Sequence, residues 1–126
     1  MNGHQPVHRL HALGGVALML IGGAHVAVAF AGYTSLSLDA LWFVGSGFFV
    51  LLAGAVNVVF STALPDGAPG RRGLRLVALL ANGAGTLLAG AFVWMTQGQQ
   101  VQGIVLLLLF VACLSVASFS TPKRNS

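Results

Sequence analysis

The chain has 126 residues, of which 56% are apolar and 6% are charged, with a mean hydropathy of +0.88 and a formal net charge of +4. Soluble domains carry roughly 25% charged residues, so this composition excludes a soluble domain and indicates a chain covered by lipid. Six cations are too few for the continuous basic face of a nucleic-acid-binding protein. The single cysteine, Cys113, excludes intramolecular disulfides, CxxC redox pairs and cysteine-rich metal sites.

Four apolar runs follow one another along the chain, at residues 12–31, 40–60, 76–95 and 104–119. A transmembrane helix needs about 20 residues, because it rises about 1.5 Å per residue across roughly 30 Å of hydrocarbon. The sequence therefore predicts an all-α membrane protein, a single domain over residues 1–126 with four transmembrane helices in an up-down bundle. With flanking residues, we expect helices at about 10–32, 38–61, 73–96 and 101–121, and a longer loop at about 62–72.

Positive charge predicts the orientation of this bundle. All six cations flank the apolar runs on one side of an up-down arrangement: Arg9, Arg71, Arg72, Arg75, Lys123 and Arg124. Because Lys and Arg near helix ends stay in the cytoplasm, we expect both termini and the 62–72 loop to be cytoplasmic. In the alternative interpretation the first run is a cleaved signal peptide, since Ala-x-Ala sequences occur within residues 27–31.

Few polar side chains lie inside the predicted spans. Polar groups are costly in hydrocarbon, so each one is a candidate for a function or for a link between helices. His25 in the first helix and Ser46 in the second lie at similar depth, about 9 Å from the outer ends of their helices. We expect a hydrogen bond between them rather than an intramembrane Ser/His hydrolase, which also needs an oxyanion hole and access to water.

Asn57 and Asn82 are the other polar candidates, in the cytoplasmic halves of two adjacent antiparallel helices. We expect their amides to bond to each other or to backbone and to fix this helix pair. In the alternative interpretation, both asparagines line a small cavity together with Ser46 and His25. Such a cavity would admit a lipid headgroup, a quinone or another solute.

Histidines in and before the first helix suggest two further sites. His11 and His25 are 14 residues apart and share a helix face, a spacing that resembles the haem-binding helices of dihaem b-type cytochromes. The other three helices contain no histidine, so haem would require a parallel homodimer. His4, His8 and His11 fall at i, i+4 and i+7, which suits a divalent metal because zinc accepts three histidines and a water. Pro6 disfavours helix immediately before it, and the simpler alternative is a basic tail near anionic headgroups.

Three short segments carry a resemblance to known proteins. They are the histidine-containing first helix, residues 41–47 (LWFVGSG) at the start of the second helix and residues 54–57 (GAVN) near its end. Together they resemble uncharacterised small bacterial four-span membrane proteins. The resemblance implies a bacterial plasma (inner) membrane location, and it implies no activity because those families have none assigned.

Three classes of function remain open, and none of them is an enzyme. The first is a structural, interaction or lipid-associated protein without a cofactor, whose partners are the bilayer, another membrane protein or a second copy. The second is a carrier or channel for a small neutral or hydrophobic solute. The third is a haem or metal protein that uses the histidines. A proton-coupled exporter is disfavoured, since both carboxylates, Asp39 and Asp66, lie outside the apolar runs.

Overall fold

The structure, a computed structural model, describes residues 5–62 and 68–119. Within these ranges it contains four helices and no strand: α1 (Gln5–Gly32), α2 (Leu38–Thr62), α3 (Arg71–Met95) and α4 (Val101–Phe119). All four are long and apolar enough to cross a membrane. The prediction of an all-α chain with four spans is confirmed, and this architecture is that expected of a multi-pass membrane protein.

The predicted helix ends agree with the structure to within a few residues, except at the start of α1. This helix begins at Gln5, about five residues earlier than expected, and it contains Pro6 in its first turn. Proline is tolerated there because the first N–H groups of a helix have no partner within the helix. The expectation that Pro6 keeps the preceding residue out of the helix is therefore wrong. The predicted end of α4 at 121 lies outside the described residues.

Short links reverse the chain between α1 and α2 and between α3 and α4. The Ser37 hydroxyl accepts a hydrogen bond of 3.1 Å from the Ala40 N–H and so caps the start of α2. After α3, Gln97 and Gly98 adopt positive φ angles of 51° and 72°. The Gly98 N–H then bonds back to the Val93 carbonyl at 2.9 Å, which ends the helix with a left-handed turn.

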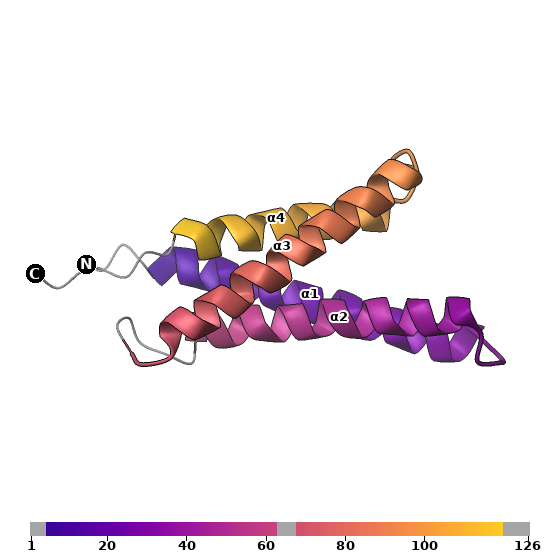
Figure 1. Cartoon of the computed structure of the whole chain (residues 1–126), viewed down its shortest axis with the longest axis horizontal. Coiled ribbons are helices and arrows are strands. Elements are labelled where there is room, and N and C mark those ends of the chain that lie inside the picture. The colour runs from indigo at the N-terminus through magenta and orange to yellow at the C-terminus, as the bar shows by residue number, and fades with distance from the viewer. Residues whose placement is uncertain (1–4, 63–67, 120–126) are drawn as a thin grey trace, which may run out of the picture.

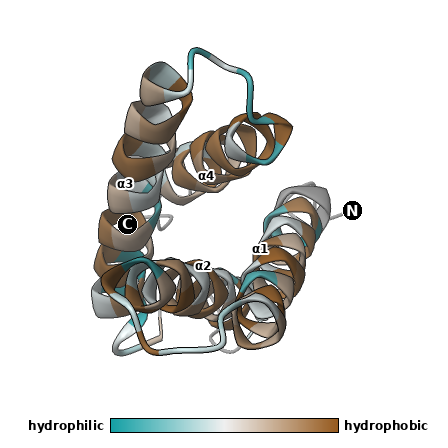
Figure 2. Ribbon diagram, turned by 90° about the vertical axis from the view of Figure 1, so that its right-hand side faces the viewer, coloured by the Kyte–Doolittle hydropathy of each residue, from teal (hydrophilic) through white to brown (hydrophobic). Residues whose placement is uncertain are grey.

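The four helices form two antiparallel hairpins, α1–α2 and α3–α4 (Figure 1). Between the hairpins, α2 packs on α3 and α1 packs on α4. The hairpins lie close together at the end where α1 and α3 begin and α2 and α4 end. Toward the α1–α2 and α3–α4 links they separate, as both views show (Figures 1 and 2). We call these the converging end and the diverging end.

Glycines bring the backbones of α1 and α2 into direct contact. A Cβ atom added at Gly22 would lie 2.5 Å from the Leu51 nitrogen and 2.6 Å from the Gly47 oxygen. In the same way, a Cβ atom at Gly54 would lie 2.5 Å from the Gly15 oxygen. No side chain fits at these positions, and close backbone approach is a principal source of helix association in membranes. The α1–α2 hairpin is therefore interlocked along its length.

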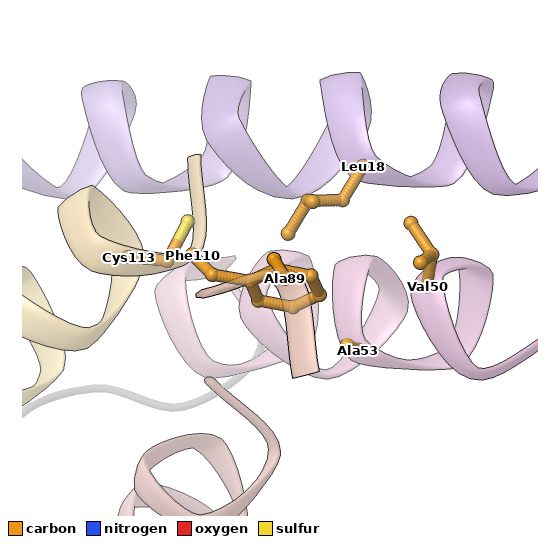
Figure 3. Packing of buried hydrophobic residues seen from close by; sticks show 6 residues of the cluster. All are labelled: Leu18, Val50, Ala53, Ala89, Phe110 and Cys113. Atoms are coloured by element: carbon orange, nitrogen blue, oxygen red, sulfur yellow. The ribbon is translucent and has the colours of Figure 1, made fainter. Parts of the chain in front are cut away.

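The two hairpins meet in an apolar core near the middle of the helices. Its buried side chains come from all four helices (Figure 3): Leu18, Val50, Ala53, Ala89, Phe110 and Cys113. Phe110 occupies the space that Gly85 leaves on α3, and its ring centroid lies 6.1 Å from that of Phe49 on α2. A second, smaller cluster at the converging end contains Phe60, Ala78 and Ala117. The core thus covers the converging half of the bundle.

Candidate functional site

Asn57 and Asn82 form a reciprocal amide pair between α2 and α3. Asn57 Nδ2 donates to Asn82 Oδ1 at 2.9 Å, and Asn82 Nδ2 donates to Asn57 Oδ1 at 2.7 Å and to the Ala78 carbonyl at 2.8 Å. Both side chains are fully buried. The predicted pairing of the two amides is confirmed. Because each amide is occupied by the other, neither asparagine lines an open surface in this structure.

The amide pair extends through Ser61 to His11 on α1. Ser61 Oγ donates to the Asn57 carbonyl at 2.8 Å and lies 2.7 Å from His11 Nδ1. Serine has one proton, and Ser61 gives it to the carbonyl, so His11 Nδ1 carries the proton of this hydrogen bond. His11, Ser61, Asn57 and Asn82 form what we call the polar network. Ser61 was not among the predicted candidate residues, although its i+4 spacing from Asn57 was a signal for this contact.

Ser61 and His11 are not arranged as a nucleophile and its base. In a Ser/His hydrolase the imidazole accepts the serine proton. Here the direction is the reverse, because the serine proton goes to the Asn57 carbonyl and the imidazole is the donor. The contact therefore joins α1 to α2.

The described part of the predicted metal site consists of His8 and His11. His11 is 1% exposed, with its ring edge-on to Phe60 at 5.6 Å. Its Nε2 atom has no hydrogen-bond partner among the described residues, and neither has His8 Nδ1. Within the same residues, no three His, Cys, Asp or Glu side chains are placed to hold a metal. His4 lies outside the described residues, so the site of His4, His8 and His11 stays a prediction.

The haem hypothesis requires His11 and His25 to face a second copy of α1. In this structure His11 is enclosed by its own chain, with Phe60 and Ser61 of α2 against its ring. His25 is half-buried and stacks on Phe43 of α2, with ring centroids 3.7 Å apart and planes at 14°. A copy of α1 does not reach His11 without opening the bundle. Haem ligation by this pair stays a prediction to which the geometry adds no support.

The expected hydrogen bond between His25 and Ser46 is wrong. Ser46 Oγ donates instead to the Phe43 carbonyl of its own helix at 2.9 Å, and the side chain is exposed. A helical serine reaches a carbonyl three or four residues back without help from any other element. His25 makes no hydrogen bond to any residue in 5–62 or 68–119. Its ring instead stacks on Phe43.

His25 and Ser46 nevertheless lie on helix faces that continue from the core. Residues seven apart share a face, so His25 follows the buried Leu18 on α1. On α2, Ser46 lies one turn before the buried Val50. In the core, Leu18 and Val50 pack with residues of α3 and α4. Toward the diverging end, the ribbons of the two hairpins separate (Figures 1 and 2). We call His25, Phe43 and Ser46 the open inner surface.

Two arginines of α3 cap the ends of α2 and α4. Arg71 Nη1 donates to the Phe60 carbonyl at 3.3 Å, with the guanidinium 5.0 Å from the Phe60 ring centre. Arg75 donates from Nε to the Ala117 carbonyl at 2.9 Å and from Nη2 to the Ser118 carbonyl at 2.6 Å. The last carbonyls of a helix lack partners and carry negative partial charge. The sequence indicated only a topological role for these arginines, although their i, i+4 spacing suits a shared structural one.

The geometry gives two distinct regions, one closed and one open. Three members of the polar network are buried, Ser61 is half-buried, and all four bond to one another, so the network serves as a structural joint at the converging end. The open inner surface presents an imidazole and a hydroxyl beside aromatic rings where the hairpins separate. Comparison with known proteins finds no family model, no curated protein and no solved structure that matches this chain.

Proposed function

We propose that this chain is a membrane interaction protein whose two hairpins hold a transmembrane segment of another membrane protein against the open inner surface. The observation that carries the proposal is that each hairpin is closely packed within itself while the two separate from each other (Figures 1 and 2). Glycines interlock α1 with α2, and α4 packs Phe110 against Gly85 of α3. Toward the diverging end, the open inner surface is therefore not covered by the opposite hairpin.

The chemistry of the open inner surface suits a partner that is largely apolar and carries one polar group. Phe43 supplies apolar area on α2, and His25 supplies a ring whose nitrogens bond to no described residue. An unpaired polar group is costly in hydrocarbon. A transmembrane segment with a hydrogen-bonding side chain at this depth would pair with His25 and cover the Phe43 ring.

The proposal includes a location and an orientation. We place the protein in a bacterial plasma membrane with the converging end in the cytoplasm, because Arg9, Arg71, Arg72 and Arg75 all lie at that end. It includes no catalytic step and no cofactor. The lipid bilayer and the clasped segment are its partners.

Cysteine labelling tests this orientation. In a Cys113→Ser background, single cysteines replace Ser35 and Gln99 at the diverging end and Gly73 at the converging end. A membrane-impermeant maleimide added to intact cells is expected to label positions 35 and 99, and to label position 73 only after the membrane is opened. Residue 73 suits the purpose because it is exposed and a Cβ there has open space. Labelling of position 73 from outside would reverse the proposed orientation.

Photocrosslinking in cells that express the chain naturally tests the proposed partner. A benzophenone amino acid at Ser46 is compared with one at Leu87, an exposed residue of α3. Both lie about 12 Å from the diverging ends of their helices, so membrane depth is matched. We expect one discrete protein adduct from position 46, identified by mass spectrometry, and none from position 87. Equal protein adducts from both positions would contradict the proposal.

A hydrophobic solute is the second candidate occupant. The nitrogens of His25, which bond to no described residue, could bind a polar group of such a solute as well as one of a protein. The same experiment separates the two, because a carrier yields lipid or small-molecule adducts at position 46 and no protein adduct. His25→Phe adds a further comparison, since phenylalanine keeps an aromatic ring beside Phe43 and removes the hydrogen-bonding atoms. If His25 binds the polar group of a protein partner, this variant weakens the adduct at position 46.

A further inference from the structure

The hydrogen bond between His11 and Ser61 determines which nitrogen of the imidazole carries the proton. Ser61 Oγ gives its own proton to the Asn57 carbonyl and accepts one from His11 Nδ1. In the neutral ring, Nε2 then carries a lone pair. Histidines that bind metals are oriented in this way, because the nitrogen that does not bind the metal donates its N–H to a neighbouring group. His11 thus has the tautomer and the support of a metal ligand.

This lone pair is buried and makes no hydrogen bond. His11 is 1% exposed, and its Nε2 atom has no partner among the described residues. The two nitrogens of an imidazole point in widely different directions, so Nε2 faces away from Ser61 on α2. A buried polar atom without a partner is costly, and most such atoms in proteins are paired with a residue, a water or an ion. The lone pair of Nε2 therefore suits a cation or a hydrogen-bond donor.

Cys113 of α4 lies beside the same face of α1. Its backbone is next to the His11 ring. Its sulfur lies against Gly14, where an added Cβ would be 3.0 Å from Sγ. His11 and Gly14 are three residues apart and share a face of α1. The thiol is buried, with its sulfur directed toward α1 (Figure 3). A buried thiol and a buried imidazole nitrogen are thus neighbours where α1 packs on α4.

We propose that His11 Nε2 and Cys113 Sγ bind one Cu(I) ion between α1 and α4. Thiolate and imidazole are both copper ligands, and the soft thiolate selects Cu(I), which is stable with two ligands. Zinc usually takes four, and no three His, Cys, Asp or Glu side chains of residues 5–62 and 68–119 are placed to hold a metal. Binding replaces the thiol proton, which is released to water. The ion and the thiolate together are then neutral, as a site inside a membrane bundle favours.

The copper site goes beyond the proposed function, which needs no metal. A bound ion would join α1 to α4, as the amide pair of Asn57 and Asn82 joins α2 to α3. Because only the folded bundle brings the two ligands together, Cu(I) is expected to stabilise it against unfolding.

Titration with Cu(I) tests the site. The full chain in mild detergent is titrated without oxygen with the coloured Cu(I) complex of bicinchoninate, and transfer of the ion is followed by the loss of colour. We expect one ion per chain. Cys113→Ser and His11→Gln are each expected to lower the affinity at least about 100-fold, because loss of even an outer partner of a metal ligand costs roughly 10- to 100-fold.

A relocated thiol is the matched control. Cys113→Ser combined with Ser115→Cys keeps one cysteine on α4 but places it on an exposed side of the helix. Equal Cu(I) affinity of this variant and the unaltered chain would overturn the site, because any thiol would then suffice. X-ray absorption of the copper-loaded, unaltered chain needs no variant. One sulfur and one nitrogen ligand are expected, and two sulfurs, one from each of two chains, would contradict the proposal. Neither result depends on the adduct at position 46.

Discussion

Gly22→Ala is expected to destabilise the folded bundle by about 3 kcal/mol, at the upper end of the usual cost of overpacking. The added methyl group would lie 2.5 Å from the Leu51 nitrogen and 2.6 Å from the Gly47 oxygen. Both are backbone atoms of α2, so no side-chain rotation relieves the overlap. The α1 and α2 backbones must move apart, and the contacts along the whole hairpin are weakened together.

Gly23→Ala is the matched control for this variant. It lies in the same turn of α1, yet its Cβ would meet only Leu51 Cδ1, at 4.0 Å. Alanine is a better helix former than glycine by up to about 1 kcal/mol, so this variant is expected to be neutral or slightly more stable. Denaturation in mixed detergent micelles, followed by circular dichroism, measures both. Equal stability of the two variants would mean that the α1 and α2 backbones are not in contact.

The fold could be predicted from the sequence because hydrocarbon imposes two strong constraints. Spans must be helices of about 20 apolar residues. The lengths of the second and third apolar runs therefore predicted the ends of α2 and α3 to within about two residues. The amide pair could be predicted for a related reason. Asn57 and Asn82 lie at matching levels of antiparallel neighbours, and a buried amide that lacks a partner is costly. Only a few polar side chains lie at the same depth in the membrane, so residue numbering alone can predict which two of them pair.

Other contacts could not be predicted, because they depend on local competition or on helix angles. Ser46 donates to a carbonyl of its own helix. Every helical serine can make such a bond, so the sequence does not indicate whether Ser46 bonds to its own helix or to His25. The position of His11 inside the bundle, against Ser61, was not predicted. The separation of the hairpins depends on the angle at which α2 and α3 cross, which the residue pattern did not indicate. The amide pair and the Arg71 cap both join α2 to α3 toward the converging end.

Asn57→Leu is expected to destabilise the bundle by about 1.5 kcal/mol, near the upper limit measured for polar links between membrane helices. Leucine is close to asparagine in size, so the main effect is the loss of two hydrogen bonds of 2.9 and 2.7 Å to Asn82. The Asn82 amide is then left fully buried, with only the Ala78 carbonyl as a partner. Part of the cost is therefore the unpaired group rather than the lost bond.

The double variant Asn57→Leu/Asn82→Leu separates these two contributions. It removes both amides and leaves no orphaned group, so its cost is expected to be clearly less than the sum of the two single variants. Thr86→Val is the control, because Thr86 Oγ1 bonds only to the Asn82 carbonyl of its own helix and crosses to no neighbour. Its effect should stay within about 0.5 kcal/mol. Additive single variants would show that the two asparagines act separately, and α2 and α3 would then lack the polar joint that holds the two hairpins together at the converging end.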